Sequence, residues 1–351
     1  MRFPEFTEEW KKCTIDDLCE EFKSGKNIKA DNILGEGEYP VFGGNGLRGY
    51  TDSYNHEGDY VLIGRQGALC GNVRFVTGKT YITEHAIAAK ATNDNDIRFL
   101  KSLFIQLNLG QFSDQSAQPG LAVNKLLKIE TSVPSRIEQA KIASLLSIID
   151  ERITTQNKII EDLKKLKSAI SLKILHSDSW EQFKIKDIAS IGRGRVISSI
   201  EISQQENPLY PVYSSQTSNE GIMGYLDNYM FEGEYISWTT DGANAGTVFY
   251  RNGKFNCTNV CGLLKLRNGF DTHFVSLVLS EATKKYVSIN LANPKLMNNT
   301  MGNIQIRLPK FEEQKRISII FKKLQELLDV QKHLLCKYSK QKQYLLHQMF
   351  I

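Results

Sequence analysis

The sequence contains an internal repeat that covers most of its length, and this repeat constrains the fold more than any other feature. Tyr39-Pro40-Val41 returns as Tyr210-Pro211-Val212, and from Gly46, which returns as Gly221, the offset stays at 175 residues. Further positions recur at this offset over about 130 residues, among them Gly49, Tyr50, Gly58, Tyr60, Pro134 and Gln139. A constant offset over that length indicates a tandem duplication.

Each copy is predicted to be a globular domain followed by a long helix. The globular parts, 1–134 and 177–309, contain short β-rich runs separated by glycines. One helix is expected in each, near Arg98–Leu109 and near His273–Lys285. Asn252-Gly253 lies between two β-rich runs and predicts a type I′ hairpin.

The segments 135–176 and 310–351 contain neither proline nor glycine and carry apolar residues at heptad spacing. A helix of about 35 residues extends on the order of 52 Å. Two such stripes most simply bury each other as an antiparallel coiled coil, whose pseudo-twofold axis would bring Gln156 and Gln331 together. The predicted core positions are Ile142, Leu146, Ile149, Ile153, Gln156, Ile160 and Leu163 in the first helix, and Ile317, Phe321, Leu324, Leu328, Gln331, Leu335 and Tyr338 in the second. The alternative is two ordinary amphipathic helices, each packed on its own domain.

Together these patterns predict an α+β protein. Two tandem, strand-rich mixed α/β domains related by a pseudo-twofold axis would be separated by a pair of long antiparallel coiled-coil helices.

Composition narrows the class of protein. At 41% hydrophobic and 24% charged residues, the chain is typical of a soluble globular protein. Neither an apolar run long enough for a membrane span nor a signal peptide is present, and the six cysteines form no CxxC pair. We therefore expect a cytoplasmic location and no metal site.

The charge is unevenly distributed along the chain. The net charge is +5, of which the helical segments carry +3 and +5 and the globular parts −3 and 0. Attraction of the globular parts to nucleic acid would therefore depend on local patches.

The sequence offers little for catalysis. Asn207-Pro208-Leu209-Tyr210 resembles the Asn-Pro-Pro-Tyr signature of adenine methyltransferases, but its third position differs and no glycine-rich cofactor loop accompanies it. Gly78-Lys79-Thr80 lacks the first glycine of a phosphate-binding loop. No catalytic constellation recurs in both copies, so we predict that the chain is not an enzyme by itself.

The junctions between domain and helix carry the most specific motif. They read Pro134-Ser-Arg-Ile-Glu138-Gln139 and Pro309-Lys-Phe-Glu-Glu313-Gln314. With the repeated domain-plus-helix plan, the chain resembles the specificity subunit of type I restriction-modification systems. The segments 64–68 and 118–121 are similar to recurring target-domain motifs of that family, from which their counterparts 239–243 and 293–296 depart.

This resemblance implies that each target recognition domain reads one half of a bipartite, asymmetric double-stranded DNA sequence. The helices would set the spacing between the half-sites and bind two modification subunits, which use S-adenosylmethionine to methylate adenine. Restriction subunits, the motor-nuclease components that use ATP and Mg²⁺, would complete the complex. No cofactor is expected in this chain, which would associate with the prokaryotic nucleoid when bound to DNA.

Glycine-punctuated loops bring short polar side chains close to base edges, so we predict the DNA contacts there. The candidates in the first copy are Lys26, Asn27, Arg48, Arg65, Gln66, Gln118, Asn124 and Lys125. Those in the second are Arg193, Arg195, Ser215, Gln216, Thr239, Thr240, Asp241, Asn244, Asn293, Lys295 and Asn298.

Two other functions remain open from sequence. One is a coiled-coil scaffold whose domains bind protein and no DNA. The other, less favoured, is a stand-alone adenine methyltransferase.

Overall fold

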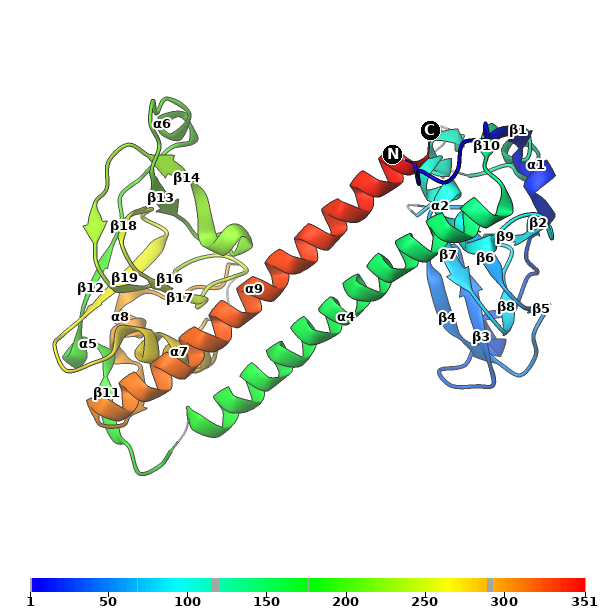
Figure 1. The fold of residues 1–351 in the computed structure, drawn as a ribbon. Helices are drawn as coiled ribbons and strands as arrows, with labels where there is room; N and C mark the ends of the chain where they lie inside the picture. The colour runs from blue at the N-terminus through cyan, green and yellow to red at the C-terminus, as the bar shows by residue number, and fades with distance from the viewer. Residues whose placement is uncertain (1, 68, 115–119, 176, 289–292, 351) are drawn as a thin grey trace. The chain divides into compact units, whose positions relative to one another are not determined.

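The computed structural model describes residues 2–67, 69–114, 120–175, 177–288 and 293–350, which fall into two compact units. The first unit comprises 1–158 and 332–351, and the second comprises 159–331. Each unit therefore contains one globular domain and a part of both long helices (Figure 1).

The first domain consists of two four-stranded sheets and a two-stranded ribbon. The sheets have the strand orders β2-β9-β6-β7 and β4-β3-β8-β5, and the ribbon pairs β1 with β10. The strands are β1 (Lys11–Thr14), β2 (Cys19–Ser24), β3 (Tyr39–Gly43), β4 (Gly46–Thr51), β5 (His56–Glu57), β6 (Tyr60–Gly64), β7 (Val73–Val76), β8 (Lys79–Ile82), β9 (Ala86–Ala91) and β10 (Glu130–Val133). The α-helices are α1 (Ile15–Leu18), α2 (Ile97–Gln106) and α3 (Val123–Leu126).

The second domain repeats this topology strand for strand. Its sheets have the orders β12-β19-β16-β17 and β14-β13-β18-β15, and its ribbon pairs β11 with β20. The strands are β11 (Glu181–Lys184), β12 (Ala189–Arg193), β13 (Tyr210–Tyr213), β14 (Ile222–Leu226), β15 (Phe231–Glu232), β16 (Tyr235–Thr239), β17 (Val248–Arg251), β18 (Lys254–Cys257), β19 (Cys261–Leu266) and β20 (Gln305–Leu308). The α-helices are α5 (Ile185–Ile188), α6 (Ser199–Ser203), α7 (Thr272–Ala282) and α8 (Asn298–Asn303). The parallel pair β3–β8 also recurs, as β13–β18. The predicted α+β class with tandem domains is confirmed.

The two predicted domain helices begin at a capping aspartate. Asp96 Oδ1 accepts hydrogen bonds from the amides of Arg98 and Phe99 at the start of α2, and Asp271 Oδ1 accepts one from the amide of Phe274 at the start of α7. Phe99 and its counterpart Phe274 are fully buried in the main cores of their domains. The cap therefore fixes where each helix starts, and the buried ring fixes which face turns inward.

The long helices are α4 (Arg136–Ile174) and α9 (Phe311–Met349). In the first unit, Asp150 of α4 forms an ion pair with Lys342 of α9, and Arg152 lies over the ring of Tyr338. The contacts proceed in opposite directions along the two helices, so their segments in this unit are antiparallel. Every predicted core position of both stripes is buried or half-buried.

Asp150 joins three helices of the first unit. Its carboxylate also binds Lys101 of α2, with an N–O distance of 2.8 Å. Burial raises the pKa of this carboxyl, but the hydrogen bonds from Lys101 and Lys342 outweigh burial and hold the pKa below its ordinary value. In the second unit the related pair is Lys167 of α4 and Gln325 of α9, 2.7 Å apart.

The glutamine that opens each stripe contacts its own domain. Gln139 Oε1 accepts from the amide of Asp96 at 2.9 Å, and its Nε2 donates to Asn95 and to the Pro134 carbonyl. Gln314 likewise accepts from the amide of Asp271 at 3.0 Å and donates to Pro309. The junction motif is thus a joint that ties the start of a long helix to the start of a domain helix.

The predicted Asn252-Gly253 hairpin is wrong. Gly253 does adopt a positive φ of 102°, as a tight turn needs. However, β17 before it pairs with β16, whereas β18 after it pairs with β13 and β15 in the other sheet. The turn therefore carries the chain from one sheet to the other.

The far ends of the long helices close the domain cores. Phe350 stacks on Phe99 with ring centroids 5.2 Å apart and meets Trp10 edge-on. Leu175, which lies 175 positions earlier, is buried in the core of the second domain. Among the described helices, none is both long and apolar enough to cross a membrane.

One cross-strand pair shows how the two cores diverged while keeping one backbone. Ile63 faces Ile87 between β6 and β9, whereas Trp238 faces Gly262 between β16 and β19. A Cβ atom on Gly262 would lie 2.3 Å from the indole ring of Trp238. The large and small residues of the second copy therefore fill the space of the two medium-sized residues of the first.

We predict that Gly262→Ile lowers the free energy of unfolding by about 3 kcal/mol through overpacking. Trp238→Ile should cost about 3 kcal/mol through a cavity and the lost bond from its indole N–H to the Leu296 carbonyl. In the double variant the two losses should offset each other by about 2 kcal/mol. Denaturant unfolding of the four proteins measures this coupling, and strict additivity would contradict the packing argument.

Candidate nucleic-acid interface

In the first domain, loops distant in sequence meet at the segment 82–85 between β8 and β9. The amide of Lys26 donates to the Ile82 carbonyl at 3.0 Å, and the amide of Arg65 donates to the His85 carbonyl at 2.9 Å. Gly44 packs so closely that a Cβ atom there would lie 2.7 Å from the His85 carbonyl oxygen. Only a glycine lets the turn between β3 and β4 approach this segment.

Two further predicted DNA contacts and a fourth loop also lie near the segment 82–85. The Arg48 side chain on β4 runs over Gly43, the last residue of β3, and Gln66 Oε1 lies 3.0 Å from His85 Nδ1. The amide of Leu121 donates to the Arg65 carbonyl at 2.9 Å. The described parts of the two segments that resemble target-domain motifs, 64–67 and 120–121, are therefore neighbours.

Four cations without ion-pair partners in the described part of the chain lie on these loops and on the strands β4 and β7 beside them. Among the described residues, no ion pair involves Lys26, Arg48, Arg65 or Arg74. Arg65 is half-buried and the other three are exposed. Unpaired guanidinium and ammonium groups on these loops and the adjoining strands bring local positive charge to a domain whose net charge is negative.

The second domain uses the same backbone arrangement around the segment 257–260. The amide of Arg195 donates to the Cys257 carbonyl, and the amide of Thr240 donates to the Val260 carbonyl, each at 3.2 Å. The amide of Leu296 donates to the Thr240 carbonyl at 2.9 Å. Gly194, where a Cβ atom would lie 1.6 Å from the Cys257 carbonyl oxygen, plays the part of Gly25 in the first domain.

The side chains displayed there are different. Arg193 Nε donates to Asn298 Oδ1 at 2.9 Å, and Arg195 pairs with Glu201. The hydrogen bonds that Arg195 donates to that carboxylate raise the pKa of Arg195. Asp241 lies 4.0 Å from Lys295. The second domain thus presents paired charges and amides where the first presents free cations.

Several predicted contacts need correction or qualification. Thr239, the last residue of the inner strand β16, and Thr240, which follows it, are 1% and 0% exposed. Their side chains therefore cannot reach DNA from this position. Lys125 is exposed but is paired with Asp114. Gln118 lies outside the described residues.

The remaining candidates lie at or near the surface, all on loops except Asn124, which is on α3. Exposed are Asn27, Asn124, Asn244 and Asn293; half-buried are Ser215 and Gln216, and the Gln216 amide already donates to the Ile222 carbonyl.

Sequence reasoning missed Arg74 and His85. Arg74 is exposed on β7, with its guanidinium against Gly46. Its counterpart in the second copy is Phe249, and a cation present in only one copy is the signal that could have found it.

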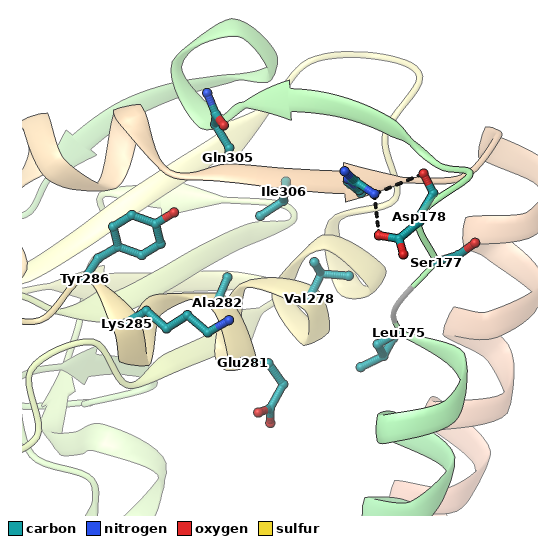
Figure 2. Close-up of a pocket in the computed structure, with 11 residues that line it drawn as sticks. Leu175, Ser177, Asp178, Val278, Glu281, Ala282, Lys285, Tyr286, Gln305 and Ile306 are labelled. Atoms are coloured by element: carbon teal, nitrogen blue, oxygen red, sulfur yellow. Dashed lines mark hydrogen bonds and ion pairs between the residues drawn. The ribbon is translucent and has the colours of Figure 1, made fainter.

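A cavity of the second domain is separate from these loops. Its volume is about 360 Å³, and its lining includes Leu175, Glu281, Tyr286 and the ion pair of Asp178 with Arg307 (Figure 2). None of the predicted DNA contacts lines it. The described residues hold no group of three or more His, Cys, Asp or Glu side chains suited to a metal ion.

A family model for the type I restriction modification DNA specificity domain matches residues 7–165 and 177–337. The chain belongs to this family. A putative type I specificity subunit from Mycoplasma pneumoniae is 36% identical over 214 residues, which make up 58% of this chain and 77% of that protein. The EcoprrI type I restriction enzyme specificity subunit from Escherichia coli is 40% identical over 173 residues, 48% of this chain and 42% of that one.

The fold also matches a solved structure. The crystal structure of the type I restriction-modification S subunit from M. genitalium has a TM-score of 0.77 at 20% identity, covering 99% of this chain and 98% of that chain. Specificity subunits are non-catalytic components of type I systems, and this chain is one of that kind.

Proposed function

We propose that this specificity subunit reads a bipartite, asymmetric DNA sequence, one half with each domain. The observation that carries the proposal is the meeting of four loops in each domain around one inter-strand segment, with the same backbone hydrogen bonds and different side chains. A shared scaffold holds both readers in the same pose, and divergent side chains let the half-sites differ.

The long helices are proposed to set the spacing between half-sites and to bind two modification subunits. Their inner stripes are buried, yet both also expose large apolar side chains to solvent. On α4 these include Ile137, Ile148, Leu166 and Leu172, and on α9 they include Ile319, Leu327, Val330 and Tyr344. Exposed apolar residues along otherwise charged helices suit a protein partner. S-adenosylmethionine would bind in the modification subunits, and ATP and Mg²⁺ in the restriction subunits.

Mapping N6-methyladenine across the host genome, with the gene intact and deleted, tests the proposal. We expect deletion to remove methylation from one split, asymmetric motif on both strands. If no motif changes while the modification subunit is expressed, DNA reading is refuted and a protein-binding scaffold becomes the better account.

The free cations of the first domain should contact phosphates. The triple variant Lys26→Ala, Arg48→Ala, Arg74→Ala should weaken DNA binding by the assembled complex and reduce the slope of log K against log salt by about 2–3. The control variant replaces Lys11 and Lys12 of the β1–β10 ribbon and Lys90, which pairs with Glu20, by alanine. It removes the same positive charge away from the loops. Equal slopes for the two triple variants would argue against a phosphate-binding patch.

Substitutions at two adjacent isoleucines can distinguish binding of the modification subunit from folding of the helix pair. Ile149 is 4% exposed in the core of the first unit, whereas Ile148 is 47% exposed on the same turn of α4. We expect Ile149→Glu, like Ile153→Glu, to disrupt the folded helix pair and so abolish assembly. Ile148→Glu should retain the helical circular dichroism and thermal midpoint yet lose co-purification with the modification subunit. Undiminished co-purification of Ile148→Glu would show that this face does not dock a partner.

A further inference from the structure

The second domain contains a loop that the first domain lacks. Tyr39 returns after 171 residues but Gly46 after 175, so four residues have been added between these points. In the first domain β3 ends at Gly43 and β4 begins at Gly46, whereas β13 ends at Tyr213 and β14 begins only at Ile222. The added residues thus extend the connection to Ser214–Gly221, which we name the 214–221 loop.

This loop is held in an uncommon backbone conformation. Asn219, Glu220 and Gly221 have φ angles of 49°, 53° and 84°, three successive residues in the left-handed region. Non-glycine residues rarely adopt this region. Each one held there costs of order 1–3 kcal/mol, which contacts with the surrounding structure must offset. Something outside the loop must therefore stabilise this conformation.

Arg251 at the end of β17 supplies that support. Its Nη2 donates to the Glu220 carbonyl at 2.8 Å, and its Nε donates to Ser237 Oγ at 2.9 Å. The guanidinium lies 3.5 Å from the ring centroid of Tyr213 and 4.4 Å from that of Phe249. One side chain thus joins the loop to two strands of the neighbouring sheet.

Arg251 is an unusual residue to bury. It is 4% exposed, burial lowers its pKa, and among the described residues no carboxylate forms an ion pair with it. A buried cation with no carboxylate at ion-pair distance costs free energy that its hydrogen bonds and aromatic contacts only partly offset. The equivalent positions of the first domain hold Val76 and, for Ser237, Leu62, both buried and apolar. The buried arginine and the longer loop therefore occur in the same copy and touch each other.

The loop has the chemistry of base recognition. Its side chains are hydroxyls and amides with one carboxylate and no cation: Ser214, Ser215, Gln216, Thr217, Ser218, Asn219 and Glu220. Such a loop has nothing to attract phosphates but can pair with base edges, where Asn fits adenine. Thr217, Ser218 and Asn219 are exposed. The loop leaves β13 beside the segment 257–260, because the Thr258 amide donates to the Tyr213 carbonyl at 2.9 Å.

We propose that the 214–221 loop determines base specificity in the second half-site, with Asn219 contacting a base and Arg251 acting as its positioning residue. This inference rests on the proposed DNA-reading function. It adds Asn219 and Arg251 to the determinants of specificity and separates them from the phosphate-binding cations of the first domain.

Three variants test it in the complex with the modification subunits. Asn219→Gly keeps a residue that tolerates positive φ while removing the amide. Arg251→Met keeps the apolar bulk while removing both hydrogen bonds. The third variant gives the second domain the residues of the first: Gly-Gly-Asn-Gly in place of 214–221, with Ser237→Leu and Arg251→Val. Because the first domain folds with these residues, this variant guards against simple unfolding.

The readout is methylation of a library in which both half-sites are randomised. We expect Asn219→Gly and Arg251→Met to lose discrimination at the same base position of the second half-site, by on the order of 10-fold. The third variant should change that half-site more broadly. The first half-site and the salt dependence of binding should stay as in the wild type.

The possible results distinguish failure of this inference from failure of the proposed function. Unchanged discrimination by Asn219→Gly and by the third variant would overturn the role of the loop. If Arg251 is merely structural, the Arg251→Met complex should methylate every site less, in proportion to its lower thermal stability, and should keep its sequence preference. That result would overturn the positioning role of Arg251. A wild-type complex that methylates no split motif would overturn the proposed function itself, and with it this inference.

Discussion

A single buried glutamine amide ties each long helix to its domain, and the geometry of both units depends on it. Gln139 satisfies the free backbone amide of Asp96, which in turn caps α2, and Gln314 does the same for Asp271 and α7. A buried amide left unpaired would cost about 1–3 kcal/mol, so the helix start and the domain helix cannot move independently. The recurrence of this joint in both copies explains why proline and glutamine keep their spacing at the two junctions.

Around this joint the two copies share a backbone and differ in what they display. Strand order, the parallel pair and the hydrogen bonds of the loops are the same in both domains. Core pairs differ in a compensated way, as Trp238 with Gly262 against Ile63 with Ile87 shows. Surface residues differ without compensation. The first domain has free cations, whereas the second has paired charges and a longer loop that contains no cation. Packing limits change in the core, whereas a surface that reads DNA is free to diverge.

Individual residues show which structural features the sequence predicted correctly and which it did not. The heptad stripes predicted two long helices, because an apolar period of 3.5 residues without proline or glycine has few other solutions. The turn at Asn252-Gly253 was predicted correctly as a tight turn and wrongly as a hairpin, because a positive φ fixes the turn but not the sheet that the next strand joins. Thr239 and Thr240 were predicted at the surface from a motif position, yet they lie at the end of the inner strand β16 and directly after it, and both are buried. Arg251 gave no signal, since a lone arginine in a strand is ordinarily exposed.

The sequence by itself determined the duplication, the domain-plus-helix order, the buried stripes of the helices and the family, because these depend on periodicity and spacing along one chain. The tertiary structure decided which loops meet around the segments 82–85 and 257–260, which cations stay free and which are paired, and that a buried arginine supports the 214–221 loop. These properties depend on contacts between residues far apart in the chain, whose geometry is set by strand pairing and close packing rather than by local sequence.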